Sequence, residues 1–285
     1  MEVIGTTAND TWIGLLETIK TCGNVVQPRG FKCYEVMNLR TCFPMHKPIV
    51  TVRDRNLGYR FLFAEALWIL EGKEDVATIA PFSKHIVQFS DDGETFFGAY
   101  GPRIVDQINW VVRKLAEDRD TRQAVLTIWQ ENPYDSKDIP CTISVQFLIR
   151  DGLLHCIDNM RSSDAWLGWP YDVFNFTMLS SAVIIALKDT YPDIRMGQLW
   201  MNLGSAHLYD RNMVGVDKCL ANPKDYRFRY PLLQDPKAEW PTVEDLFHHL
   251  YCVSRNLHSE LKSQWVCCVA RGDHNKKGDA NAEVE

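Results

Sequence analysis

The stretch 141-CTISVQFLIRDGLLHCIDNMRSSD-164 decides the architecture that we expect for this chain. Apolar residues stand at positions 143, 145, 147 and 149, which is the spacing of a strand with one buried face. Asp151 and Gly152 suit a two-residue turn, and the chain then returns through His155 and Ile157. The stretch therefore predicts a β-hairpin.

Helical and strand patterns alternate on both sides of this hairpin. Apolar content and spacing predict helices at 10–21, 59–72, 104–118, 171–187 and 243–261. Strands are expected at 31–38, 48–53, 124–129 and 198–209, and a glycine-rich loop at 91–103. No internal repeat and no linker rich in Pro or Ser is present. We expect one α/β or α+β domain over residues 1–268 and a polar, disordered tail over 269–285.

Composition narrows the class of protein. The 285 residues are 46% hydrophobic and 24% charged, which is ordinary for a globular chain. No stretch of about 20 apolar residues occurs, and the first residues lack a secretory pattern, so we expect a cytoplasmic protein without a membrane span. The net charge of −6 argues against stable nucleic-acid binding, although local arginines can still bind one small anion.

The nine cysteines are odd in number and include no CxxC pair, which favours reduced thiols over a disulfide framework or a zinc ribbon. No metal site is expected. Cys141 follows Ile139 and Pro140 at the start of the hairpin, where proline can hold a thiol at the rim of a site. Cys141 is therefore a candidate nucleophile, with eight other cysteines as rivals.

Two acids stand in apolar surroundings. Glu65 lies within AEALWIL, and it is either a core acid with a local partner, an acid at the solvent edge of a helix, or a proton shuttle with a raised pKa. Asp172 lies within 168-GWPYDVFNF-176, where a carboxylate needs a partner. The sequence around Asp172 does not identify the group that pairs with its carboxylate.

Other polar residues are candidates for binding an anion or a sugar. Arg161 is followed by Ser162 and Ser163, which together offer a guanidinium fork and two hydroxyl groups. His207 and Tyr209 lie on one face of an extended segment and could bind sugar hydroxyls. Further candidates for phosphate capture are Arg29, Arg119 and Arg122. Each has a plainer interpretation as a solvated charge or a satisfied core residue.

Several motifs in order resemble thymidylate synthase and its relatives, the deoxycytidylate hydroxymethylases of bacteriophages. The resemblance runs from about residue 29 to residue 232. The motifs are EALWILEG, GAYG, TRQAVLTIW, IPCTISVQF, MRSSDAWLGWPYDVFNF, and GSAHLYDRN followed by LANP. The resemblance implies a large mixed β-sheet flanked by helices, with a homodimer formed sheet face against sheet face.

The resemblance also implies a mechanism. Cys141 matches the family's nucleophile, whose thiolate adds to C6 of a pyrimidine nucleotide and makes C5 electron-rich. C5 then attacks the methylene group of 5,10-methylenetetrahydrofolate, which is a co-substrate. Glu65 matches a glutamate that organises water and proton transfers, and Tyr100 matches a tyrosine near C5.

The binding residues follow from the same resemblance. Arg161, Ser162 and the adjacent Ser163 match the phosphate-binding segment of the same subunit. Arg29 matches an arginine of a mobile loop, and Arg122 matches one that reaches the phosphate in the partner subunit.

Sugar and folate contacts are implied as well. His207 and Tyr209 match residues that hold the sugar 3′-hydroxyl. Asp164 matches a folate contact, and Gly168 and Glu65 are assigned to the same folate site.

The resemblance gives Asp172 a partner. Thymidylate synthases carry asparagine here, whose amide accepts from N3–H and donates to O4 of uracil. Cytosine has an unprotonated N3 and an amino group at C4, so a carboxylate with one shared proton suits it. Aspartate here resembles the deoxycytidylate hydroxymethylases, and we expect a cytosine nucleotide because opposed acceptors are costly.

Departures from the synthases suggest the product. Gln123 replaces a usual second arginine, and Ser205 replaces a usual acid. The chain ends in GDANAEVE, which does not match the apolar closing tail of synthases, and 84-KHIVQFSDDG-93 lacks their tryptophan. These elements keep water from the exocyclic methylene intermediate, so their absence fits attack by water and a 5-hydroxymethyl product.

We therefore expect a dCMP 5-hydroxymethyltransferase, an enzyme suited to modifying DNA precursors in a phage-infected or bacterial cytoplasm. Alternatives are a dCMP methylase, a ribo-CMP hydroxymethylase and a thymidylate synthase that acts on dUMP. A catalytically dead nucleotide- or RNA-binding regulator is a further alternative, against which the retained Cys141, Glu65 and Arg161 argue.

Overall fold

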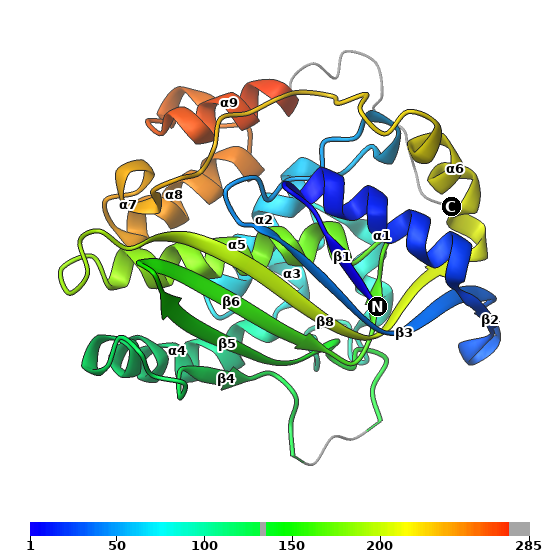
Figure 1. The fold of residues 1–285 in the computed structure, drawn as a ribbon, viewed down its shortest axis with the longest axis horizontal. Helices are drawn as coiled ribbons and strands as arrows, with labels where there is room; N and C mark the ends of the chain where they lie inside the picture. The colour runs from blue at the N-terminus through cyan, green and yellow to red at the C-terminus, as the bar shows by residue number, and fades with distance from the viewer. Residues whose placement is uncertain (132–134, 274–285) are drawn as a thin grey trace.

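The computed structural model describes residues 1–131 and 135–273, which fold around one mixed β-sheet (Figure 1). The sheet has the order β1-β3-β8-β6-β5-β4, with β2 paired to β3 and β7 paired to β8. The β1–β3, β6–β8 and β7–β8 pairs are parallel and the other pairs are antiparallel. The strands of the described residues are β1 Glu2–Ile4, β2 Asn24–Val26, β3 Cys33–Pro44, β4 Val125–Thr127, β5 Thr142–Arg150, β6 Leu153–Met160, β7 Ser163–Asp164 and β8 Arg195–Tyr209. The predicted α/β class with a large mixed sheet is confirmed.

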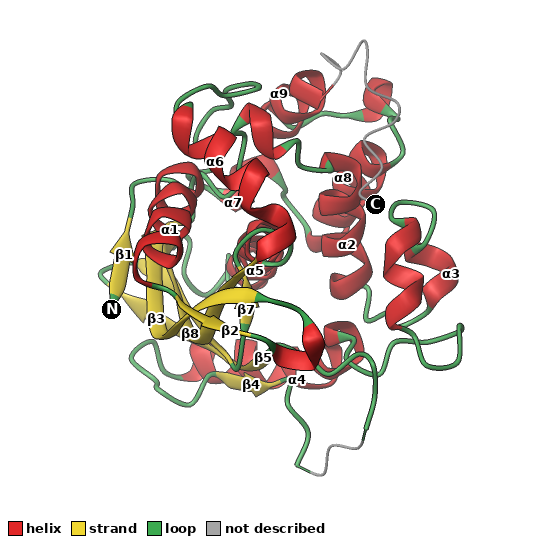
Figure 2. Cartoon of the chain, turned by 90° about the vertical axis from the view of Figure 1, so that its right-hand side faces the viewer, coloured by secondary structure: helices red, strands yellow, loops and turns green. Residues whose placement is uncertain are grey.

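The helices gather mainly on one face of the sheet (Figure 2). α5 packs on β6 and β8, α2 packs on α5, and α8 packs on α2. Almost every residue of α5 is buried, as expected for a helix that is apolar on all sides. The α-helices of the described residues are α1 Ala8–Cys22, α2 Tyr59–Leu70, α3 Val76–Ile79, α4 Tyr100–Glu117, α5 Trp169–Ala186, α6 Met213–Ala221, α7 Pro236–Glu239, α8 Val243–Ser254 and α9 Gln264–Asp273.

The β5–β6 hairpin forms as the sequence predicts, but Ile143 is 40% exposed rather than buried, because a β-bulge between Thr142 and Ser144 breaks the alternation. Asp151 and Gly152 connect the strands with φ angles of +51° and +76°, which are the left-handed angles of a tight two-residue turn. Burial alternates along β6, so Cys156 and Asp158 face the helices while His155 and Ile157 face the other side. The hairpin thus brings the start of β5 beside the end of β6.

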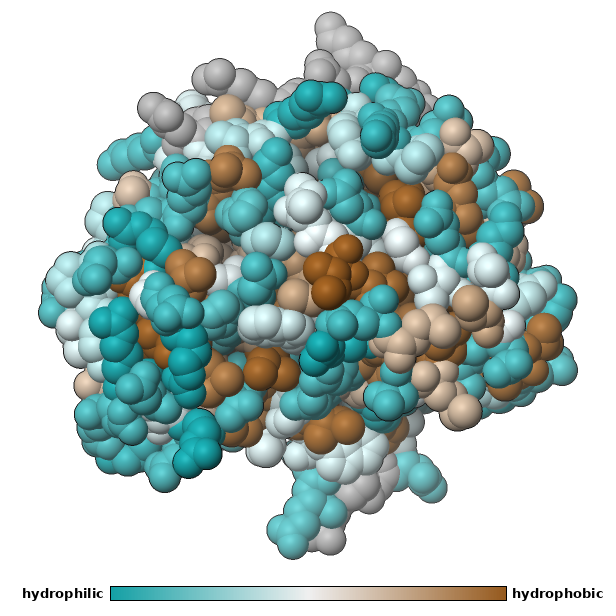
Figure 3. Space-filling view, in the orientation of Figure 1, coloured by the Kyte–Doolittle hydropathy of each residue, from teal (hydrophilic) through white to brown (hydrophobic). Residues whose placement is uncertain are grey.

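The opposite face of β5, β6 and β8 points toward the viewer in Figure 1, while α5 lies behind these strands. Its side chains are half-buried and contact one another: the rings of His155 and Trp200 are 5.2 Å apart, and Asn202 Nδ2 donates to Asn159 Oδ1 at 2.9 Å. Figure 3 shows hydrophobic side chains set among hydrophilic ones over this side of the molecule.

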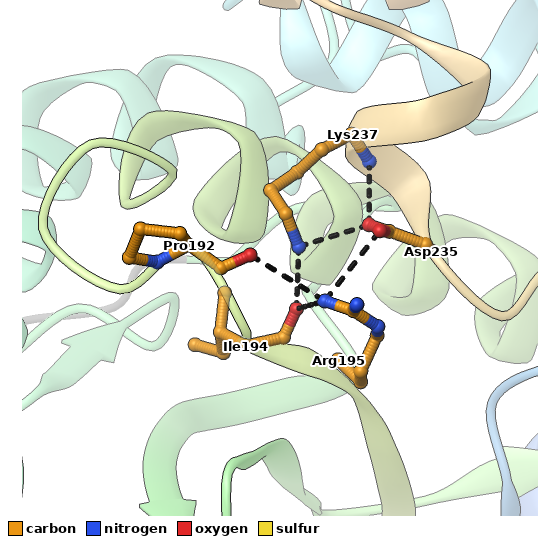
Figure 4. A network of polar contacts seen from close by, with 5 residues as sticks. All are labelled: Pro192, Ile194, Arg195, Asp235 and Lys237. Atoms are coloured by element: carbon orange, nitrogen blue, oxygen red, sulfur yellow. Dashed lines mark hydrogen bonds and ion pairs between the residues drawn. The ribbon is translucent and has the colours of Figure 1, made fainter.

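A polar network ties the start of α7 to the start of β8 (Figure 4). The Asp235 carboxylate forms ion pairs with Lys237 at 2.9 Å and with Arg195 at 3.5 Å. Lys237 Nζ also donates to the carbonyl of Ile194. These contacts hold the start of α7 against the start of β8.

Several predicted boundaries were wrong. The strand predicted at 31–38 continues to Pro44 as β3. Residues 48–53 form no strand, because side chains satisfy their backbone: Tyr230 Oη accepts from Ile49 N at 2.7 Å, and Asn9 Oδ1 accepts from Thr51 N at 2.7 Å. α4 begins at Tyr100, inside the predicted loop. The predicted helix 243–261 ends at Ser254 and is followed by the 3-10 helix His258–Glu260.

The C-terminal boundary also differs. α9 continues to Asp273, with Val269 and Ala270 buried, so the predicted start of the tail at 269 falls inside a helix. Residues 274–285 lie outside the described part, and their predicted disorder stays a prediction. Among the described residues, no helix is both long and apolar enough to cross a membrane.

Candidate active site

The Cys141 thiol lies half-buried immediately before β5, where the hairpin brings it beside Arg161 and Ser162 at the end of β6. Its sulfur is 3.7 Å from Ser162 Oγ and 3.8 Å from Arg161 Nη2. Burial raises the pKa of the thiol, and the Arg161 guanidinium opposes that rise. Among the eight cysteines that the structure describes as free thiols, Cys141 is the one whose sulfur has a hydrogen-bond contact with a guanidinium.

Arg161 also shapes the loop that carries the thiol. Its Nε donates to the Pro140 carbonyl at 2.9 Å, and its Nη2 donates to the Ile139 carbonyl at 2.8 Å. Its backbone N–H donates to the Cys141 carbonyl at 2.8 Å. The side chain remains exposed, with Nη1 donating to Ser162 Oγ at 3.0 Å. Arg161 therefore both fixes the thiol's position and presents positive charge at the rim of the site.

Glu65 projects from α2 and accepts a hydrogen bond from Asn175 of α5, with Asn175 Nδ2 at 2.8 Å from its Oε2. Burial raises the pKa of Glu65 to about 7, against the lowering effect of this hydrogen bond. The local partner and the raised pKa, which were separate alternatives at the level of sequence, occur together. A carboxyl group with this pKa can exchange a proton near neutral pH.

Asp172 lies in the first turn of α5 and is half-buried. Its carboxylate oxygens accept no hydrogen bond from any residue in the described ranges. Burial raises its pKa well above the ordinary value, and the charges of Glu65 and Asp164 raise it further. No side chain of the described protein pairs with Asp172, so its half-buried carboxyl group remains open to water or to a ligand.

Tyr100 is the first residue of α4 and lies near Asp172 and Cys141. Its hydroxyl accepts from Thr142 N at 3.2 Å, and its ring stacks on Phe176 at 6.4 Å between centroids. Burial raises the pKa of Tyr100 well above its ordinary value, and the charges of Asp172 and Cys141 add to this effect. Tyr100 therefore keeps its proton while it lies near both groups.

The remaining predicted residues differ in their surroundings. Asp164 Oδ1 accepts from the backbone N–H groups of Trp166 at 2.8 Å and Leu167 at 3.0 Å, so it shapes the turn into α5. Gly168 closes this turn, and a Cβ atom there would lie 3.4 Å from Asp172 Oδ2. Ser163 is buried with an unpaired hydroxyl, so Ser162 is the serine that faces the thiol.

His207 and Tyr209 lie together near the end of β8, with ring centroids 5.3 Å apart. Their predicted common face is confirmed. Arg29 is exposed in the 3-10 helix Pro28–Gly30, and Arg122 is exposed before β4. Within the described residues, no hydrogen bond or ion pair holds either guanidinium group, so neither is brought into the site by its own chain.

Sequence reasoning missed three polar residues near the site. Asn175 follows Asp172 by three residues on α5, so helical spacing could have placed it on the same side. Thr142 and Asp158 are wholly buried. Strand alternation could have placed Asp158 toward the helices, whereas Thr142 lies on that side because a β-bulge between Thr142 and Ser144 breaks the alternation of β5.

Potential metal ligands gather elsewhere in the described part of the chain. His248, Cys252 and Glu260 offer atoms within 4.8 Å of one another, on α8 and the turn after it. None of these residues belongs to the site around Cys141, and the expected absence of a metal stays a prediction.

The fold and this grouping of a thiol with acids and an arginine agree with a comparison to known families. The family model described as thymidylate synthase matches residues 10–247. The chain belongs to the thymidylate synthase family, as the sequence motifs predicted.

Two relatives carry the name deoxyuridylate hydroxymethyltransferase. The protein of Bacillus phage SP01 is 30% identical over 228 residues, which cover 72% of this chain and 58% of the relative. The protein of Pseudomonas phage M6 is 34% identical over 140 residues, which cover 46% of this chain and 40% of the relative. The chain thus matches little more than half of one relative and less than half of the other, and their names specify a uracil nucleotide rather than cytidylate.

Proposed function

We propose that the protein is a 5-hydroxymethyltransferase for a pyrimidine nucleoside monophosphate, with dCMP as its substrate and 5,10-methylenetetrahydrofolate as the one-carbon donor. The observation that carries the choice of base is the unsatisfied Asp172 carboxyl group beside Cys141 and Tyr100. The relatives' names support transfer of a hydroxymethyl group.

The proposed covalent step begins at Cys141. Its thiolate adds to C6 of the base, and the electron pair of the C5–C6 double bond moves toward C5 and the ring carbonyl or imine. Because burial raises the pKa of the thiol, formation of the thiolate depends on nearby positive charge. Arg161 supplies that charge at 3.8 Å, and the phosphate of the substrate is the anion expected to bind the same guanidinium group.

C5 then forms a bond to the methylene carbon of the folate, and the C5 proton leaves. Elimination of tetrahydrofolate gives an exocyclic methylene group. Water adds to this group, and loss of Cys141 from C6 restores the ring. The balanced reaction consumes dCMP, methylenetetrahydrofolate and water, and it yields 5-hydroxymethyl-dCMP and tetrahydrofolate. Glu65, with its pKa of about 7, is suited to the proton transfers.

The protonation state of Asp172 governs the choice of base. The ionised acid only accepts hydrogen bonds, so it suits a cytosine that donates from its amino group and from a proton at N3. The neutral acid has one donor and one acceptor. It can match the uracil edge, and it can match the cytosine edge when the other oxygen carries the proton. Uracil therefore requires neutral Asp172, whereas cytosine tolerates both states.

A second candidate is hydroxymethyl transfer to dUMP. Two observations favour it: the relatives' names specify deoxyuridylate, and burial raises the pKa of Asp172 toward the neutral form. Sugar choice is a separate part of the proposal, in which His207 and Tyr209 bind the 3′-hydroxyl of deoxyribose.

Water attack rather than hydride transfer distinguishes the proposal from a methylase. The segment that lacks the synthase tryptophan includes the 3-10 helix Lys84–Phe89, which contains the exposed side chains Val87 and Phe89. The segment GDANAEVE, residues 278–285, lies outside the described residues. Asp164 and Gly168 are the proposed folate contacts beside the turn into α5.

We further propose a homodimer that pairs the open faces of β5, β6 and β8. The half-buried Trp200 and Ile157 on this face support an interface, since such groups gain stability when they are covered. Arg122 would then reach the phosphate in the partner subunit, in agreement with its exposure and its lack of a partner in its own described chain.

The test is mass spectrometry of the products formed with methylenetetrahydrofolate and dCMP, CMP or dUMP in separate reactions. The proposal expects a hydroxymethyl product from dCMP. A methyl product accompanied by dihydrofolate would refute the water step, and turnover of dUMP alone would refute the choice of base. A protein that releases no tritium from C5 of any of these nucleotides would be a binding protein instead.

A further inference from the structure

A second group of chemically reactive side chains lies on α8 and on the turn that follows it, outside the site around Cys141. The ring nitrogen Nε2 of His248 is 3.6 Å from the sulfur of Cys252 and 4.0 Å from Oε2 of Glu260. The sulfur and the Glu260 oxygen are 3.9 Å apart. One nitrogen, one sulfur and one oxygen therefore converge on a single point.

These distances are close to the edges of a tetrahedral metal site. With Zn–N and Zn–O bonds of about 2.1 Å and a Zn–S bond of about 2.3 Å, tetrahedral ligand atoms lie about 3.4 to 3.6 Å from one another. The side chains of His248 and Glu260 are exposed, so small rotations about their side-chain bonds can close the remaining difference. Cys252 is buried and supplies the fixed member of the set.

The sequence brings the three residues together through two local features. His248 and Cys252 are four residues apart on α8, so they lie on one side of the helix. Asn256 then turns the chain with a φ of +59°, and the Leu257 N–H donates to the Cys252 carbonyl at 2.8 Å. This backbone contact returns the 3-10 helix that contains Glu260 to the side of Cys252. The backbone thus positions the group independently of its side-chain contacts.

A plainer interpretation is a surface ion pair beside a buried thiol. The His248–Glu260 pair is about half exposed, and such a pair contributes little to stability. It leaves the position of the sulfur unexplained, because a structural cysteine packs as a small apolar residue, whereas Cys252 contacts both polar groups.

The kinds of ligand atom indicate the class of ion. A thiolate at Cys252 and a carboxylate at Glu260 carry two negative charges, which match a divalent cation, and a neutral imidazole at His248 adds the third ligand. Thiolate and imidazole are ligands that Zn²⁺ and similar transition-metal ions prefer, whereas Mg²⁺ and Ca²⁺ take oxygen ligands. The set therefore favours zinc or a similar ion.

We propose that His248, Cys252 and Glu260 bind one Zn²⁺ or similar divalent ion, with water as the fourth ligand. The Cys252 thiol loses its proton to solvent when the metal–sulfur bond forms. The ion joins α8 to the 3-10 helix after it, and α8 packs on α2 and contacts α9 (Figure 2), so binding stabilises this group of helices. The site does not depend on the proposed function. It departs from the expectation of no metal, which rested on the absence of a CxxC pair.

The test titrates the full chain with Co²⁺ and Zn²⁺ after dialysis against a chelator. We expect one equivalent of Co²⁺ to produce a thiolate-to-cobalt charge-transfer band, and one equivalent of Zn²⁺ to remove it. His248→Gln and Glu260→Gln should each weaken Zn²⁺ binding by more than about 100-fold, since loss of a partner outside the ligand shell alone costs up to about 100-fold. Zn²⁺ should raise the melting temperature of the wild type more than that of either variant.

The controls separate this site from other thiols and imidazoles. Cys22→Ser and His85→Gln alter exposed residues outside the group and should bind Zn²⁺ like the wild type. Cys141→Ser should keep the cobalt band, whereas Cys252→Ser should abolish it. If Cys252→Ser does not fold, the variants at the exposed residues His248 and Glu260 still decide the question.

Three results would overturn the inference. The first is a wild-type protein that gives no thiolate-to-cobalt band. The second is Zn²⁺ affinity that is equal in the wild type, His248→Gln and Glu260→Gln. The third is a band that disappears in Cys141→Ser, which would place the ion at the active-site thiol.

Discussion

Replacing Asp172 with asparagine should reverse the base preference of the enzyme. The carboxyl group is half-buried, unpaired within the described chain, and next to Tyr100 and Cys141. The amide removes one contact between two acceptors when uracil binds, which is worth about 1.5 kcal/mol. It also removes a charge-assisted hydrogen bond to cytosine, which is worth about 1.5 kcal/mol more.

The two contributions together change the relative free energies of the dCMP and dUMP transition states by about 3 kcal/mol. This corresponds to a change of about 100-fold in the ratio of the two kcat/KM values. The assay is steady-state kinetics with each nucleotide, with the products identified by mass spectrometry. Asp217→Asn is the matched control, because Asp217 is an exposed acid on α6 that pairs with Lys20. A ratio that changes less than threefold in Asp172→Asn would refute the assignment of Asp172 to base recognition.

Three further predictions follow from the site. Asn175→Ala should raise the pKa of Glu65 further above about 7, because it removes the hydrogen bond that stabilises the carboxylate; a basic limb of the kcat profile that fails to move upward would contradict this. Because the folded protein holds the Glu65 proton more tightly than the unfolded chain, the wild-type free energy of unfolding should fall by roughly 3 kcal/mol as pH rises from about 4.5 to 7. Glu65→Gln should not show this fall, because glutamine does not titrate. Equal pH dependence of the two unfolding free energies would exclude this prediction. Arg161→Ala should shift alkylation of Cys141, followed by peptide mass spectrometry, to higher pH, because the guanidinium lowers the pKa of the thiol, and an unshifted profile would argue against that role.

The sequence predicted well those features that depend on local pattern. The hairpin followed from alternation and from an Asp-Gly turn, and α5 followed from a long apolar segment. The helix predicted at 59–72 also formed, and it ends at Leu70, two residues before Gly72 adopts a φ of +73°. Each of these features is encoded by residues that are adjacent in the chain.

The errors have a different physical origin. Residues 48–53 are apolar enough for a strand, but Asn9 and Tyr230 satisfy the backbone from distant parts of the chain. Likewise, the partnership of Glu65 with Asn175 joins residues that are 110 positions apart. Such contacts depend on tertiary packing, which local propensity does not encode.

Motif matching identified the chemical groups but not their protonation states. Asp172 was expected to share one proton with the base, and the sequence did not show that burial and two neighbouring acids raise its pKa. Asp158 attracted no notice in the sequence because an acid in a strand is ordinarily exposed. Its burial becomes visible only when α5 covers β6.

The most direct test of the central claim is product mass spectrometry with the wild-type protein, methylenetetrahydrofolate, and an equal mixture of dCMP and dUMP. If Asp172 selects cytosine and water completes the reaction, 5-hydroxymethyl-dCMP is the major product, together with tetrahydrofolate. Exclusive formation of 5-hydroxymethyl-dUMP, or of a methylated nucleotide, would contradict it.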